Sequence, residues 1–275
     1  MTERAAPDDA PTVPYDHGFY DEISPFSVSA AQVVVPIIAD LVAPASVIDV
    51  GCGTGAWLAA WQAHGVGNVL GLDGGYVDLD ALHIEREQFQ AADLEDPPTI
   101  DRRFDLAMSV EVAEHLSPAA ADGFVRFLTG LAPVVLFSAA PPGQGGVDHI
   151  NEQWPAYWAR RFASHGYRAF DIVRPRVWRE PDVAFFYAQN LVLFAVDDRF
   201  DGVEPAFPLV PDAEEPDVAV PLPVVHPELL AAVARHKGTV RPASLSSLLR
   251  QLPDATARAA RRRVQERGRS SAADG

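Results

Sequence analysis

The stretch that decides the fold class is Val47-Ile48-Asp49-Val50-Gly51-Cys52-Gly53-Thr54-Gly55. Its apolar first half predicts a buried strand, and its glycines predict a turn that leads into a helix. Glycine lets the backbone approach a ligand closely at the carboxyl end of a strand, which is where open α/β sheets bind their ligands. We therefore expect a ligand site at Gly51 to Gly55.

The residue two positions before this turn indicates the kind of ligand. Gly51, Gly53 and Ala56 satisfy the dinucleotide pattern G-x-G-x-x-A, but a carboxylate at Asp49 would repel a pyrophosphate. The same carboxylate would attract an ammonium or sulfonium group. The predicted ligand is therefore cationic.

Two further acidic residues follow the next two predicted strands. Asp73 lies 20 residues after Gly53, the place from which a carboxylate reaches a ribose diol. The alternative is that Asp73 is a turn residue beside Gly74 and Gly75. Asp93 follows the third strand, where its side chain could accept a hydrogen bond from an adenine amine.

Short apolar runs alternate with longer amphipathic ones from Val47 onward, which predicts an α/β fold around a parallel sheet. The predicted strands are Ser46 to Val50, Asn68 to Asp73, Gln88 to Ala91, Phe104 to Val110, Val134 to Ala139, Tyr167 to Val173 and Asn190 to Val196. The predicted helices are Ala30 to Leu41, Ala56 to Ala63, Pro118 to Leu131 and Gln153 to His165.

With these elements in place, V-I-D-V-G-C-G-T-G, G-L-D and A-A-D-L-E-D resemble the motifs of the class I S-adenosylmethionine-dependent methyltransferases over about residues 15–196. The resemblance implies a Rossmann-like seven-stranded sheet with helices on both faces, its seventh strand antiparallel between the fifth and sixth. It implies S-adenosylmethionine as cofactor, with the methionine part held by Asp49 and the glycine loop, the ribose by Asp73 and the adenine by Asp93. The residues assigned to the cofactor are Asp49, Gly51, Cys52, Gly53, Gly55, Asp73, Gly74, Asp93, Leu94 and Glu111.

The fourth strand runs into the sequence E-x-x-E-H. On a helical turn Glu111, Glu114 and His115 would share a face, and His149, on the loop after the fifth strand, could meet them. These four residues form a candidate site for Mg²⁺ or Mn²⁺. The arrangement resembles the metal-dependent small-RNA 2′-O-methyltransferases, and its first part also resembles the ubiquinone-pathway O-methyltransferases.

His149 and His115 are the candidate catalytic residues. The alternatives for His149 are a metal ligand, a metal-free general base that deprotonates the acceptor, and a loop residue that caps the following helix. Asn151 is expected to cap that helix. The aromatic residues Trp154 and Tyr187 belong either to the core or to the wall of a substrate pocket.

Charge and composition limit the partners. Residues 226–275 carry a net charge of +6 and residues 1–225 a net charge of −22, so the body should repel long nucleic acid, and a small-molecule acceptor is expected instead. The apolar runs are shorter than the ~18 residues of a membrane span, and the N-terminus lacks a signal-peptide pattern, so we expect no membrane association and a cytoplasmic location. Because Cys52 is the single cysteine, the chain cannot form an internal disulfide.

The predicted organisation is a disordered N-terminus at residues 1–14 and a methyltransferase domain at 15–196. An acidic, proline-rich linker or draped loop at 197–225, a helical extension at 226–267 and a disordered tail at 268–275 follow.

The functional hypothesis is transfer of a methyl group from S-adenosylmethionine to a hydroxyl of a small molecule, a natural product or a sugar. A divalent ion would activate the hydroxyl. The alternatives are N-methylation of a small molecule and a regulatory protein that binds S-adenosylmethionine without catalysis.

Overall fold

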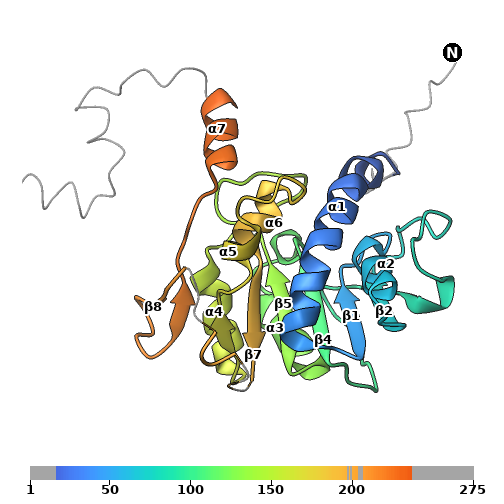
Figure 1. The fold of residues 1–275 in the computed structure, drawn as a ribbon, viewed down its shortest axis with the longest axis horizontal. Helices are drawn as coiled ribbons and strands as arrows, with labels where there is room; N and C mark the ends of the chain where they lie inside the picture. Colours follow the sequence, from blue (N-terminus) through green and yellow to red (C-terminus); the bar gives the residue numbers. More distant parts are fainter. Residues whose placement is uncertain (1–16, 197, 199, 204–206, 237–275) are drawn as a thin grey trace, which may run out of the picture. The chain divides into compact units, whose positions relative to one another are not determined.

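The computed structural model describes residues 17–196, 198, 200–203 and 207–236. Its centre is a seven-stranded sheet with the order β3-β2-β1-β4-β5-β7-β6 (Figure 1). All pairs are parallel except those of β7, which runs antiparallel to both β5 and β6. The predicted fold class and the antiparallel place of the seventh strand are confirmed.

The strands are β1 Ser46–Val50, β2 Asn68–Asp73, β3 Phe89–Ala91, β4 Leu106–Val110, β5 Val134–Ser138, β6 Arg168–Phe170 and β7 Val192–Ala195. The first two coincide with their predicted ranges. The sixth is much shorter than the predicted Tyr167 to Val173, because the chain turns after Phe170 into the short helix α5 (Arg174–Val177).

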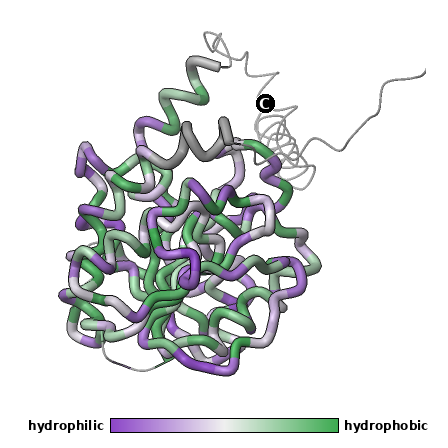
Figure 2. Tube along the Cα trace, turned by 90° about the vertical axis from the view of Figure 1, so that its right-hand side faces the viewer, coloured by the Kyte–Doolittle hydropathy of each residue, from purple (hydrophilic) through white to green (hydrophobic). Residues whose placement is uncertain are grey.

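The other helices are α1 His17–Val42, α2 Ala56–Ala63, α3 Ala121–Leu131, α4 Pro155–Ser164, α6 Phe185–Asn190 and α7 Pro227–His236, with 3₁₀ turns η1 Arg86–Gln88 and η2 Ala113–His115. α1, α2, α5 and α6 contribute to one hydrophobic core, and α3 and α4 contribute to a second. Neighbouring strand residues such as Val47 and Ile48 belong to different cores, so the helices cover both faces of the sheet. Figure 2 shows apolar segments of the chain running through the middle of the domain.

Helix α1 is longer than predicted, since it begins at His17, well before Ala30, and continues through Pro25. By length and composition alone, its window Pro25–Val42 could cross a membrane, so the prediction that no segment is long enough was wrong. Several side chains of this window are fully buried, and α1 packs against α2. α1 thus contributes to the core of the domain.

A two-stranded antiparallel sheet lies within the predicted linker. Its strands are β8 Leu209–Pro211 and β9 Ala219–Pro221, and β9 contacts α4 and β6. Arg160 of α4 bonds both carboxylate oxygens of Asp212, at 3.0 and 2.9 Å. The described part of residues 197–225 is therefore packed structure, which low sequence periodicity concealed.

By its contacts the chain divides into two units, residues 1–229 and 230–275. The boundary lies inside α7. The part of the predicted helical extension after residue 236, the N-terminus at 1–14 and the tail at 268–275 lie outside the described residues.

Candidate active site

The carboxyl ends of the central strands open into a cavity of about 810 Å³. The turns after β1, β2, β3 and β4, the loop after β5, and helix α6 all line it. Every residue predicted for the cofactor lies on its wall except Gly55, which belongs to the same loop as Gly53. The roles of these residues toward a cofactor stay predictions.

The glycine loop has the backbone that its sequence predicts. Gly51, Gly53 and Gly55 have φ angles of 85°, 52° and 84°, in the left-handed region that favours glycine. A Cβ on Gly51 would also overlap the Val112 side chain, so the loop packs tightly against the turn after β4.

Asp49 is buried in this cavity, with only 1% of its surface exposed. Burial, with a further contribution from the charge of Asp73, raises the pKa of the Asp49 carboxyl to about 8. Among the described residues its Oδ2 atom has no hydrogen-bond partner. Such a group accommodates a bound cation well, because the cation would favour its ionised form.

Asp73 organises the turn as well as lining the cavity. Its Oδ2 accepts a hydrogen bond from Gly53 N–H (2.6 Å), and its Oδ1 accepts from Gly74 N–H (2.6 Å) and from the Tyr76 hydroxyl (3.0 Å). Burial raises the pKa of Asp73, and these hydrogen bonds oppose the rise. Asp73 therefore stabilises the turn, which was the alternative in the sequence analysis. Its role in binding a ribose stays a prediction.

The adenine candidates lie at the mouth of the cavity. Asp93 is exposed, and its Oδ1 accepts a hydrogen bond from Glu95 N–H (2.9 Å), while the neighbouring Leu94 is buried. A buried apolar side chain beside an exposed acceptor suits a flat, partly polar ring.

Glu111 is bound by two side chains outside the predicted metal site. Its backbone has a φ of 56°, and its Oε1 and Oε2 accept hydrogen bonds from Asn190 Nδ2 (3.0 Å) and Gln144 Nε2 (2.7 Å). Burial raises the pKa of Glu111, and these hydrogen bonds oppose the rise. Glu111 is not among the three residues whose ligand atoms converge, and its role as a fourth metal ligand stays a prediction.

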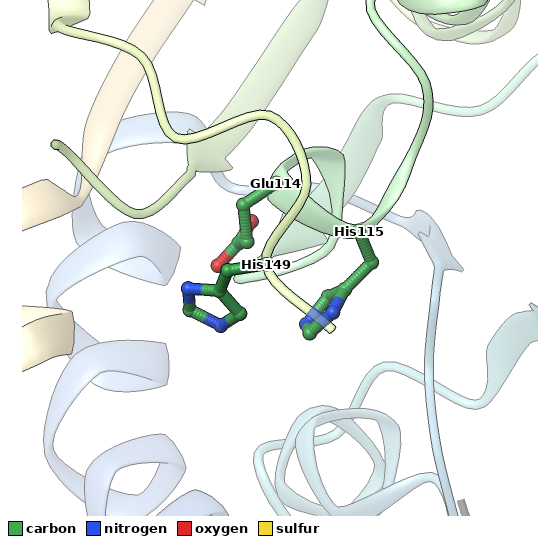
Figure 3. Close-up of side chains that lie close together, drawn as sticks. All are labelled: Glu114, His115 and His149. Atoms are coloured by element: carbon green, nitrogen blue, oxygen red, sulfur yellow. The ribbon is translucent and has the colours of Figure 1, made fainter. Parts of the chain in front are cut away.

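The other three predicted ligands do converge. One ligand atom from each of Glu114, His115 and His149 lies within 4.8 Å of the other two. Figure 3 shows the three side chains pointing toward one another, Glu114 and His115 from the turn after β4 and His149 from a separate loop. The two imidazole rings meet edge to face, 4.7 Å between centroids.

The charge state of this cluster follows from its burial. Glu114 is fully buried, and in the described part of the chain neither carboxylate oxygen has a hydrogen-bond partner. Burial and the neighbouring Glu111 raise its pKa well above the usual value. Burial and His149 lower the pKa of His115 to about 4, so this imidazole is neutral at neutral pH.

These three residues fit a divalent ion. Ligand atoms around a tetrahedral ion such as Zn²⁺ are about 3.4 Å apart, so the three side chains, whose ligand atoms lie within 4.8 Å of one another, would have to draw together to hold one ion. One carboxylate and two imidazoles leave open positions and suit Mn²⁺ better than a site made only of oxygen ligands. The fully buried Glu114 carboxyl, which lies beside both imidazoles, is the observation that favours an ion here.

Glu152 is a functional candidate that the sequence analysis missed. Its Oε1 lies 3.2 Å from His149 Nδ1, and its carboxylate also accepts hydrogen bonds from two glycine N–H groups. Burial by itself would raise the pKa of Glu152. The hydrogen bonds and the neighbouring His149 outweigh burial and hold this pKa below its usual value. The spacing H-x-x-E was the available signal, but it is common in loops and turns.

Two structural expectations near the site need correction or refinement. Asn151 does not cap α4, which begins at Pro155 without a side-chain cap; its Oδ1 accepts from Gln153 Nε2 (3.1 Å) instead. Tyr187 is buried, lines the cavity and hydrogen-bonds Ser27 (2.9 Å), so it is both a core and a wall residue. Trp154 is 39% exposed and does not line the cavity.

The comparisons with known proteins concern this same region. Residues 47–133 match the family model described as a methyltransferase domain, and no curated protein matches the chain. Among solved structures, a candidate O-methyltransferase from Nostoc punctiforme is 14% identical, over 64% of this chain and 58% of that chain, with a TM-score of 0.48. Human N-acetylserotonin methyltransferase in complex with S-adenosylmethionine is 18% identical, over 64% and 52%, with a TM-score of 0.43. The methyltransferase domain of bacterial CtHen1-C is 19% identical, over 62% and 98%, with a TM-score of 0.46.

The match spans little more than half of the first two of these chains. The family model covers the strands and turns that carry Asp49, Asp73 and Asp93, and the strand order and glycine loop are as that family implies. Residues 47–133 are therefore a methyltransferase domain, and the sheet has the strand order that the resemblance to the class I S-adenosylmethionine-dependent methyltransferases implied.

Proposed function

We propose that this protein transfers the methyl group of S-adenosylmethionine to a hydroxyl group of a small molecule. The observation that supports this proposal is that one cavity is lined both by the predicted cofactor residues around Asp49 and by the cluster of Glu114, His115 and His149. A hydroxyl must lose its proton to attack the sulfonium methyl, whereas a neutral amine is already nucleophilic. A cluster able to remove or weaken that proton therefore favours oxygen over nitrogen as the methylated atom.

The same proposal includes a divalent ion, Mg²⁺ or Mn²⁺, held by Glu114, His115 and His149. When bound, such an ion lowers the pKa of a coordinated hydroxyl. The buried carboxyl supplies charge for the ion, and the neutral His115 supplies a lone pair. In the competing version, His149 alone acts as a general base, and its contact with Glu152 suits that role as well.

A small acceptor is proposed because the chain is strongly acidic, with a formal net charge of −16. This charge repels the phosphates of a nucleic acid. A cytoplasmic location remains part of the proposal, on the sequence pattern alone. N-methylation and binding without catalysis are the alternative outcomes of the following experiment.

The experiment supplies the protein with S-adenosylmethionine carrying a ¹³C-labelled methyl group and a panel of phenols, sugars, amines and short RNAs. Methylated oxygen in a small molecule is the expected product, and its NMR shift separates O-methyl from N-methyl. Labelled amine or RNA, or cofactor binding without any product, would contradict the proposal.

Removal of metal tests the ion separately. After EDTA treatment, activity should be lost and should return on addition of Mn²⁺ or Mg²⁺, and Glu114→Gln and His149→Ala should each weaken Mn²⁺ binding measured by calorimetry. Asp212→Asn is the control, since that carboxylate lies outside the cavity. Full activity in EDTA would exclude the ion and leave His149 as the base.

A further inference from the structure

The loop after β5 is built around the His149 imidazole. The Glu152 carboxylate accepts hydrogen bonds from Gly143 N–H and Gly145 N–H, both at 2.7 Å, so it closes the loop on itself. Its Oε1 atom also contacts His149 Nδ1 at 3.2 Å. Two backbone donors and one ring nitrogen of His149 therefore converge on this carboxylate.

Glycines leave the space in which the ring sits. Gly143 and Gly145 have φ angles of 91° and 72°, which direct their N–H groups toward Glu152. At Gly146 a Cβ atom would overlap the His149 ring, with Nε2 the nearest atom. The ring is thus packed against the backbone on one side and tied to Glu152 at Nδ1.

We propose that Glu152 is a positioning residue that keeps the His149 proton on Nδ1 and the lone pair on Nε2. In a neutral imidazole the hydrogen bond made by one nitrogen decides which nitrogen carries the proton, and a carboxylate can only accept. Binding an ion and accepting a proton both require a lone pair, so the inference holds whether His149 is a metal ligand or a general base. The catalytic role of Glu152 rests on the proposed function.

A purely structural role for Glu152 makes different predictions. If Glu152 only closed the loop, its loss would change loop stability and acceptor binding but leave the tautomer of His149 unchanged. A direct measurement of the tautomer at one alkaline pH separates the two roles without an acceptor.

The experiment records long-range ¹H–¹⁵N spectra of the full chain with ¹⁵N-labelled histidine. The chain has eight histidines, and the signal missing in His149→Ala identifies His149. The wild type should show the Nδ1–H tautomer, and Glu152→Ala should shift the population to Nε2–H. Glu152→Gln, whose amide oxygen can still accept one bond from Nδ1–H, should restore most of the wild-type signal.

Two variants serve as controls. Asp212→Asn changes another carboxylate that accepts two backbone N–H bonds, from Glu214 and Glu215 at 2.9 Å, and should leave the His149 signal unchanged. Gly146→Ala should displace the ring from Glu152 and change the tautomer while the acid itself is intact. An unchanged Nδ1–H tautomer in a Glu152→Ala protein that still binds S-adenosylhomocysteine would overturn the inference.

Turnover gives a second test once the labelling experiment has identified an acceptor. Glu152→Ala should lower kcat about 10–100-fold, as for other residues that orient a working histidine, with little change in cofactor affinity. The same change in a His149→Ala background should have no further effect. An equal loss in both backgrounds would contradict positioning, whereas full activity of His149→Ala would contradict the proposed chemistry and leave the tautomer result to decide the role of Glu152.

Discussion

Buried carboxyl groups are the main feature of the site at the scale of single residues. Asp49 and Glu114 are both buried in one cavity, and burial raises the pKa of each. Without a bound cation the Asp49 carboxyl holds its proton at neutral pH, and a cation would favour the ionised form of either group. We therefore infer that positively charged ligands balance the charge of these carboxyl groups in the cavity.

The pH dependence of stability tests this for Asp49. Its pKa is raised from 3.8 to about 8 in the folded protein, so the folded state binds the proton more tightly than the unfolded state. The free energy of unfolding should therefore fall as the pH rises from about 4 to 8, by at most about 1.4 kcal/mol per pH unit from this group. Asp49→Asn lacks this loss, so its melting temperature should exceed that of the wild type at pH 8 and the two should converge near pH 4. Parallel melting curves at both pH values would contradict the raised pKa.

Cofactor selectivity is the second prediction for single residues. The protein should bind S-adenosylmethionine or S-adenosylhomocysteine and not NAD, because Asp49, Asp73 and Asp93 surround the glycine loop. Asp73→Ala should weaken binding by about 1.5–3 kcal/mol for each charge-assisted hydrogen bond lost.

Calorimetry measures these affinities, with Tyr76→Phe as the control, since it removes one hydrogen bond to Asp73 and keeps the carboxylate. NAD binding without either sulfur nucleoside would refute the cofactor assignment. An unaffected Asp73→Ala protein would restrict Asp73 to its turn role.

At the scale of elements, the glycine loop and the turn after β4 are packed against each other, so a change in one affects the other. Gly51 N–H donates to Leu72 O (2.7 Å), and the space where a side chain would lie is filled by Val112. The glycine loop, which is predicted to hold the cofactor, therefore packs against the turn that carries Glu114 and His115.

Replacing Gly51 by alanine should destabilise the protein for two reasons. The left-handed φ costs about 1–2 kcal/mol, and the overlap with Val112 adds to it. Gly65→Ala is the matched control, because Gly65 has a φ of 99° but no atom near its Cβ position, so only the backbone cost applies. Chemical denaturation should show the larger loss for Gly51→Ala, with partial recovery when Val112→Ala is added. Equal losses at both glycines would show that the overlap relaxes at no cost.

For the molecule as a whole, the segment after β7 belongs to the catalytic unit. Arg174 is fully buried, pairs with Asp171, and donates to Gln189 O (3.2 Å) and Leu222 O (3.1 Å). His226 N–H donates to the Gln189 side chain (2.6 Å). These bonds connect the end of this unit to α6, which lines the cavity.

Truncation tests where the unit ends. The sequence predicts that residues 226–275 are dispensable for cofactor binding, but a chain ending at Val225 would lose the His226 bond. We expect a chain ending at Leu229 to keep wild-type affinity for S-adenosylhomocysteine and a chain ending at Val225 to unfold at lower temperature. Calorimetry and thermal melts measure both. Lost affinity in a folded chain ending at Leu229 would indicate that later residues take part in the site.

Features encoded within a few consecutive residues could be predicted from the sequence. The alternation of apolar runs predicted β1 and β2 residue for residue, and the glycines after β1 predicted a turn with left-handed backbone. Helices α5 and α6 were missed, because they are only 4 and 6 residues long and lack a helical period of their own.

The sequence by itself determined the α/β fold, the glycine turn and the acids at the strand ends, because local pattern and backbone preference specify them. It also brought Glu111, Glu114 and His115 onto one turn by their spacing. Only the tertiary structure decided that Asn190, 79 residues away, binds Glu111, and that Glu114 is buried beside His149. The physical reason is that a buried polar group bonds whichever partner packing places within reach, and spacing along the chain does not specify that partner.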